Sequence, residues 1–157
     1  MAADLDALRA DLERCSGPAR IDPLIDLADA MTKQYRQADA RDARSHLDDA
    51  IELLHEARGC TSPSEPLRGR VAGRLGALLA IRHIVHASPG ADRDRGIELL
   101  EEALTFPNRP SAQRMADRFL LGHLLLQRSL HSAAELMARG GARSLIPSPL
   151  PPPPPRR

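Results

Sequence analysis

Aromatic side chains are scarce in this sequence, which has one tyrosine, two phenylalanines and no tryptophan among 157 residues. β-Sheet cores draw on aromatic and β-branched side chains, whereas Leu, Ile and Ala suit packed helices. Hydrophobic residues make up 42% and charged residues 27%, the ordinary values of a globular protein. The composition therefore predicts a globular all-α fold.

Cysteine is also scarce, because Cys15 and Cys60 stand far apart and form no CxxC pair. We expect them to be small apolar residues or free thiols in a reducing compartment. The acidic residues Asp4, Asp6 and Asp11 are incompatible with a secretory signal, and no apolar run is long enough to span a membrane. These features predict a cytoplasmic protein.

The motifs of common enzyme classes are missing. Neither GxxxxGK[ST] nor GxGxxG occurs, so no phosphate-binding loop is predicted. His83 and His86 share a helix face, but no third ligand follows at metal-site spacing, and solvated histidines explain them better. His55 and Cys60 have no residue nearby to orient a catalytic base. We therefore expect no catalysis, no metal, no cofactor and no small-molecule substrate.

Lysine occurs once, at Lys33, against 21 arginines, which fits a GC-rich bacterial genome. Residues 1–60 carry 8 basic and 13 acidic side chains, whereas residues 61–157 carry 14 and 8. A basic second part could attract nucleic acid. Because aromatic residues that could stack on bases are scarce among its arginines, nucleic acid is not the partner that we expect.

A repeat of 46 residues organises the chain. The segment DDAIELLHEA at 48–57 returns as DRGIELLEEA at 94–103, with seven of ten positions identical. The segment RLGALL at 74–79 returns as LLGHLL at 120–125, at the same offset. Two interleaved motifs with one period predict a repeating unit of two helices.

Helical periodicity and loop residues divide the chain further. Asp22 and Pro23 are typical of a helix start, with a capping acid followed by proline. We expect residues 1–19 to form an N-terminal helix and linker, 20–141 the helical repeats, and 142–157 a disordered proline-rich tail. The predicted helices are 3–14, 21–37, 41–58, 67–87, 92–105 and 111–130, with a shorter one near 132–139.

The paired motifs resemble the tetratricopeptide repeat (TPR), in which small residues let two helices approach closely. The matching positions are Gly76 and Gly122 in the first helix, Ala50, Gly96, Ala57 and Ala103 in the second, and Pro107 at the end. The period exceeds the usual length of about 34 residues. Stretched units of this kind are similar to repeat arrays found beside CHAT domains (caspase-like peptidases) in GC-rich bacteria. The resemblance implies a right-handed solenoid of antiparallel helix pairs, with six to seven helices.

The third unit is incomplete, because the IELL motif does not recur 46 residues on. We expect Leu120, Leu124 and Leu125 to have little downstream to cover them, so that this face docks on something, self-associates or belongs to a longer array. The tail contains Pro151, Pro154 and Arg156 in a PxxPxR pattern, which suits either a polyproline II ligand or a disordered terminus.

The resemblance implies that the first helices line a concave groove for a protein or peptide partner. The arginines Arg70, Arg74 and Arg82 could bind an acidic peptide there or pair with neighbouring carboxylates. A scaffold for protein–protein interaction is the predicted function. The alternative is the recognition segment of a larger CHAT-type peptidase or regulator whose catalytic part lies outside this chain. The predicted partner-binding residues are Asp29, Lys33, Arg70, Ala77, Ile81, His123 and Gln127.

Overall fold

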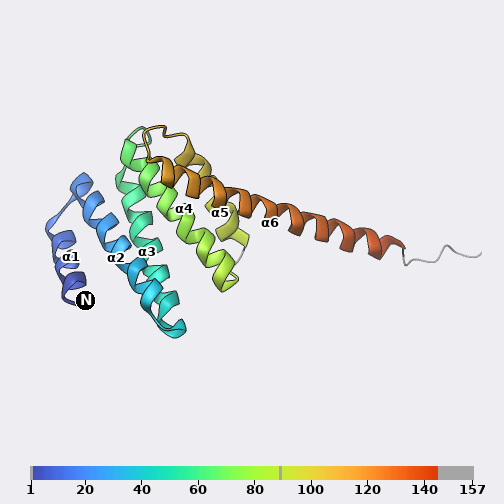
Figure 1. Ribbon diagram of the computed structural model, residues 1–157, viewed down its shortest axis with the longest axis horizontal. Coiled ribbons are helices and arrows are strands. Elements are labelled where there is room, and N and C mark those ends of the chain that lie inside the picture. Colours follow the sequence, from blue (N-terminus) through green and yellow to red (C-terminus); the bar gives the residue numbers. More distant parts are fainter. Residues whose placement is uncertain (1, 89, 145–157) are drawn as a thin grey trace, which may run out of the picture. The chain divides into compact units, whose positions relative to one another are not determined.

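The computed structural model describes residues 2–88 and 90–144, and within them it contains helices and connections but no strand (Figure 1). The all-α prediction is confirmed for these residues. The chain divides into two compact units, Met1–Leu125 and Leu126–Arg157. The elements are α1 (Ala2–Arg14), the 3-10 helix η1 (Gly17–Arg20), α2 (Ile21–Gln37), α3 (Ala40–Cys60), α4 (Pro66–His86), α5 (Gly90–Leu104) and α6 (Ser111–Ser144).

The predicted helix bounds agree with the first five α-helices to within two residues. The prediction of two helices after residue 110 is wrong, because α6 continues without a break through Ser144. The sequence SerLeuHisSer at 129–132 contains neither glycine nor proline, so nothing in it interrupts the backbone hydrogen bonds. The predicted disordered tail begins at residue 142, but residues 142–144 belong to α6. The rest of the tail, with its PxxPxR pattern, lies outside the described residues.

The start of α2 differs from the predicted cap. The 3-10 helix η1 runs directly into α2, so that Arg20 occupies the N-cap position, and its side chain makes no capping hydrogen bond to the helix. Asp22 lies inside the first turn instead of capping it. A carboxylate there still favours the helix, because it faces the positive end of the helix dipole.

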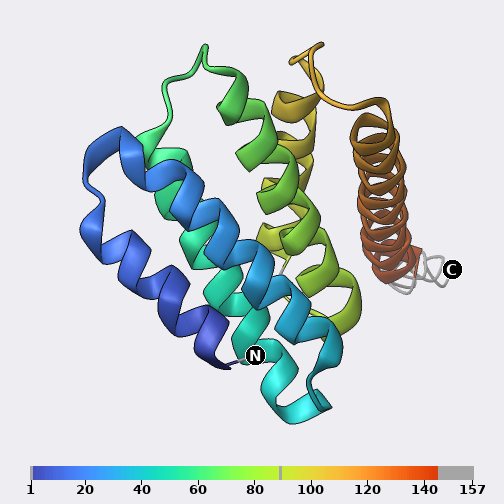
Figure 2. The same cartoon turned by 60° about the vertical axis from the view of Figure 1, so that its left-hand side comes forward.

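The first unit packs consecutive helices against one another. Helix α2 packs on α3 and α4 on α5, α3 joins these two pairs, and α1 lies along α2 (Figure 2). The main core combines side chains from α2 to α5, and its fully buried members include Leu24, Leu47, Leu75 and Leu99. Burial of these apolar side chains is the principal stabilising term of the unit.

A second, smaller core joins α4 and α5 to the first turns of α6. Leu124 is fully buried there with Ala80, Ile97 and Leu100, while Leu120 and Leu125 are half-buried against them. The sequence predicts little downstream of these leucines to cover them and hence an open apolar face. The cover comes instead from α4 and α5, which precede them in the chain, so the expected open face is not found at these three positions. The exposed apolar side chains of this part of α6 are Met115 and Phe119.

The predicted small positions of the second repeat lie where α4 and α5 approach closely. A Cβ atom on Gly76 would stand 2.9 Å from Leu100 Cγ and 3.2 Å from the Leu100 backbone nitrogen. A Cβ on Gly96 would stand 3.4 Å from the Gly76 carbonyl oxygen. The alanines predicted at Ala50, Ala57 and Ala103 are fully buried. By contrast, a Cβ on Gly122 would meet no described atom within 4 Å.

Two half-buried ion-pair networks connect α3, α4 and α5. Arg82 of α4 donates to Asp48 of α3 at 2.8 Å and to Asp92 of α5 at 2.7 Å. The Arg82 hydrogen bond holds the pKa of Asp92 below its ordinary value, although burial opposes this shift. Burial likewise acts to raise the pKa of Glu102, but hydrogen bonds from Arg68 and Arg58 outweigh it and lower that pKa.

Candidate functional site

Two neighbouring surface hollows lie along α2, α4 and the first turns of α6. The first hollow encloses about 210 Å³. It is lined by Asp29, Thr32 and Arg36 of α2, Leu54 of α3, and Arg74, Ala77, Leu78 and Ile81 of α4.

The second hollow, of about 170 Å³, shares the lining residues Arg74 and Ala77 with the first, so the two are adjacent. Its lining comprises Gly73, Arg74, Ala77, Arg109, Gln113, Ala116 and Asp117. We call the surface formed by both hollows the α2–α4–α6 face. It lies wholly within the first unit.

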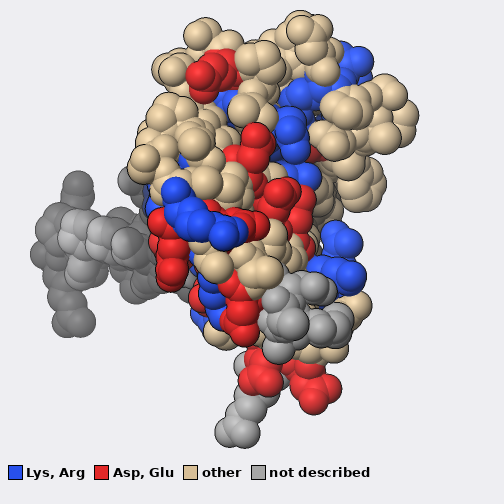
Figure 3. Space-filling view, turned by 90° about the vertical axis from the view of Figure 1, so that its left-hand side faces the viewer, with Lys and Arg blue, Asp and Glu red and all other residues tan. Residues whose placement is uncertain are grey.

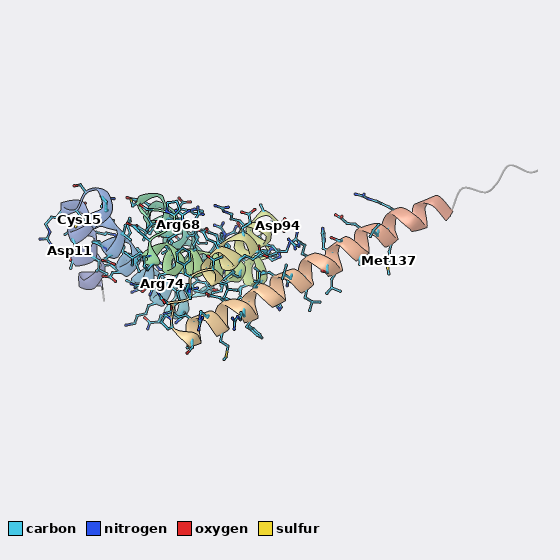
Figure 4. All side chains as sticks on the ribbon, turned by 90° about the horizontal axis from the view of Figure 1, so that it is seen from above. Asp11, Cys15, Arg68, Arg74, Asp94 and Met137 are labelled. Atoms are coloured by element: carbon cyan, nitrogen blue, oxygen red, sulfur yellow. The ribbon has the colours of Figure 1, made fainter. Side chains whose placement is uncertain are left out.

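Arg74 occupies the middle of this face, and Figure 4 shows Arg74 and Arg68 projecting from different sides of α4. The Arg74 guanidinium bonds Asp29 through Nη2 at 2.8 Å, whereas its buried Nη1 has no hydrogen-bond partner among the described residues. Burial raises the pKa of Asp29, although the charge of Arg74 opposes this shift. The face therefore presents a guanidinium donor that an acceptor atom of a bound chain could satisfy.

The floor of the second hollow rests on a buried ion pair. Arg109, from the connection between α5 and α6, bonds Asp117 of α6, and the two side chains are 5% and 6% exposed. The same guanidinium donates to the Ala103 carbonyl oxygen at 3.4 Å and lies directly over Gly73. A Cβ at position 73 would come too close to it, so a larger residue there would force the end of the Arg109 side chain to shift.

Three of the predicted partner-binding residues line the α2–α4–α6 face: Asp29, Ala77 and Ile81. Lys33 is exposed on α2 but lines neither hollow. Arg70 lines a different hollow, of about 280 Å³, together with Phe106 and the prolines Pro66, Pro107 and Pro110.

The two remaining predicted residues lie on α6. His123 is half-buried in the first unit, and its Nε2 has no hydrogen-bond partner among the described residues. Gln127 belongs to the second unit. Neither lines a hollow of the α2–α4–α6 face.

Sequence reasoning left Arg36, Gln113 and Asp117 out of the predicted set, although all three line the face. Helical spacing could have found Arg36, which lies seven residues after Asp29 on the same side of α2. It also left the role of the three arginines open. Arg82 pairs with Asp48 and Asp92, whereas Arg74 lines this face and keeps one buried donor without a hydrogen-bond partner among the described residues.

The other residues singled out by the sequence form no further site. His83 Nδ1 lies 3.0 Å from the Ser88 carbonyl oxygen, and His86 makes an edge contact with the ring of Tyr35. Cys60 packs against the main core, and burial lowers the pKa of the nearby His55. No group of three His, Cys, Asp or Glu side chains in the described part of the chain could hold a metal ion.

The charge on the surface is mixed. In the view of Figure 3, basic and acidic side chains lie side by side, and neither sign dominates the face that is drawn. This pattern agrees with the many ion pairs along α2 to α5. Among the helices that the structure describes, none has both the length and the apolar character needed to cross a membrane.

Comparison with known proteins gives no relative from which a role could be transferred. No protein family matches the chain, and no curated protein or solved structure is significantly similar to it. The resemblance to tetratricopeptide repeats therefore stays a prediction from the motifs themselves.

Proposed function

We propose that this protein is a non-catalytic interaction module that binds a segment of a partner protein along the α2–α4–α6 face. In this proposal the helix pairs stack as a right-handed solenoid of the tetratricopeptide type, and the first helix of each pair contributes to the binding surface. The protein acts as a cytoplasmic scaffold.

The observation that carries the proposal is that two hollows lie next to each other and share Arg74 and Ala77 in their linings. Small residues keep the middle of the face open, because Gly73, Ala77 and Ala116 have little or no side chain to fill it. Arg74 Nη1 and Arg109 Nε are buried donors without a hydrogen-bond partner among the described residues. A bound backbone carbonyl or carboxylate would satisfy such donors, and that gain favours a polar chain segment as the ligand.

The proposal is tested by blocking the middle of the face. Ala77→Arg places a long side chain at the residue that both hollows share. Ala91→Arg is the matched control, because Ala91 is exposed on α5 and lines neither hollow. Circular dichroism and thermal unfolding should show that both variants retain the helical content of the wild type.

Tagged wild type and both variants are then used for affinity capture from host lysate, with quantitative identification of bound proteins. A protein held in near-stoichiometric amount by the wild type and Ala91→Arg, and lost from Ala77→Arg, supports the proposed face. Equal recovery by all three proteins would place the interaction elsewhere. If folded wild type captures no protein, the proposal fails, and the recognition segment of a larger CHAT-type enzyme becomes the better account.

A further inference from the structure

The second unit presents a row of apolar side chains on one side of α6. Leu126, Leu130 and Met137 are 59%, 62% and 78% exposed. Together with Ala133 they follow one another at spacings of four, three and four residues, which places them on one face of a helix. We call these four residues the α6 stripe. Alternate spacings of three and four are the a and d pattern of a coiled coil.

Among residues 126–139, the charged side chains lie away from the stripe. Arg128, Glu135 and Arg139 occupy the outer positions of the same heptad pattern, and His131 Nε2 lies 3.2 Å from Glu135 Oε1 on that outer side. The positions that flank the stripe are Gln127, Ser129, Ala134 and Leu136, none of which is charged. A helix packed against the stripe would therefore meet apolar and neutral side chains only.

We infer that the α6 stripe binds the α6 stripe of a second copy of this chain, forming a two-helix coiled coil. A heptad row is complementary to another helix with the same row, because the side chains interlock as knobs into holes. Charges at the flanking positions usually select a different partner, and their absence here lets two identical helices meet without like-charge repulsion.

Two physical arguments favour this occupant. Most of the stability of helices in proteins comes from packing of their apolar faces, so burying the α6 stripe should stabilise this part of α6. A lipid surface would be bound better by a helix with many basic residues on its polar face. Here Arg128 and Arg139 are the only basic residues among 126–139 apart from His131, and Glu135 stands between them. The inference concerns a surface separate from the α2–α4–α6 face and does not depend on the proposed function.

The first test is sedimentation equilibrium of the full chain over roughly 1 to 500 μM, since association depends on concentration. We expect a monomer–dimer equilibrium in the wild type. Leu130→Glu places a carboxylate in each stripe and should weaken the dimer at least about tenfold, because two buried like charges then meet. Ser132→Glu adds the same charge at an outer position and should leave the dimer unchanged.

A second test does not depend on the stability of the helix. In a Cys15→Ser, Cys60→Ala background, Ala133→Cys puts one thiol near the middle of the stripe, and Ser132→Cys puts it on the outer side. Mild oxidation should crosslink the Ala133→Cys protein into a dimer much faster than the Ser132→Cys protein. A monomeric wild type at every concentration would overturn the inference, as would equal effects of the paired variants or binding to neutral or anionic vesicles in place of self-association.

Discussion

Helix α4 and the first turns of α6 carry the same motif 46 residues apart, yet their surroundings differ. Gly69 and Gly73 of α4 lie under Phe106 and Arg109, which belong to the connection after α5. The corresponding positions on α6 are Met115 and Phe119, and they are 72% and 76% exposed. The covered positions are glycines, whereas the uncovered ones carry large apolar side chains.

The difference follows from what comes next in the chain. Helix α4 is followed by α5 and by a connection that folds back over its glycines. The residues 46 positions after Phe106 and Arg109 are Pro152 and Pro155, in the tail outside the described residues. A repeated motif therefore acquires the same apolar face each time, but its packing depends on the helix that follows it.

The largest expected effect comes from breaking the Arg109–Asp117 ion pair, which holds Arg109 over α4. In Asp117→Ala the Arg109 guanidinium, 5% exposed, would be left buried without its carboxylate. The free energy of unfolding should fall by about 3–5 kcal/mol, as measured by urea denaturation. Replacing both partners by apolar residues, in Arg109→Met with Asp117→Leu, should restore most of that loss. A decrease below about 1 kcal/mol in Asp117→Ala would show that Arg109 reaches water.

The next prediction compares the loss of stability on truncating Phe106 with the loss on truncating Phe119. Phe106→Ala removes the ring that lies over Gly69 and should lower the free energy of unfolding by about 2–3 kcal/mol. Phe119→Ala removes an exposed ring and should change it by no more than about 0.5 kcal/mol. Thermal unfolding of dilute protein measures both. Equal losses of stability in the two variants would mean that the Phe119 ring is as well covered as the Phe106 ring.

Substitutions of the two matched glycines, Gly76 and Gly122, should change stability by smaller amounts and in opposite directions. Gly76→Ala forces a Cβ to 2.9 Å from Leu100 Cγ and should destabilise the fold by about 1–2 kcal/mol through overpacking. Gly122→Ala meets open space and should stabilise it by about 0.5–1 kcal/mol, because alanine favours helix. Urea denaturation of both variants tests the signs. Stabilisation by both substitutions would argue against the close α4–α5 contact.

The smallest expected effect is a pH dependence specific to the α4–α5 pair. Because Arg82 lowers the pKa of Asp92, the unfolded chain binds a proton more readily than the folded one at acid pH. The stabilisation that the Arg82–Asp92 pair gives the fold should be complete above pH 3.8, the ordinary pKa of aspartate. It should be lost as the pH falls from there through the lowered pKa of Asp92. Denaturation curves of wild type and Asp92→Asn should therefore converge as the solution is acidified. A constant gap between them would contradict the assigned cause.

Much of the fold could be predicted from local patterns. Helical spacing of apolar residues located the first five helices, and the repeated IELL motif marked residues that are buried in both copies, Ile51 and Ile97. The residues of the candidate site were predicted less well. Asp29, Ala77 and Ile81 line the α2–α4–α6 face, but Asp117 was missed because its importance depends on Arg109, which precedes it outside the helix.

The sequence by itself determined which segments are helical and which side of each helix is apolar, because both depend on interactions between residues three or four positions apart. Only the tertiary structure decided which copy of the Leu-Gly motif makes a close contact. Gly76 and Gly122 have the same local sequence signal, but within the described part of the chain a later helix packs against Gly76 and not against Gly122. Whether a small residue is required depends on atoms distant in the chain, and no local pattern contains that information.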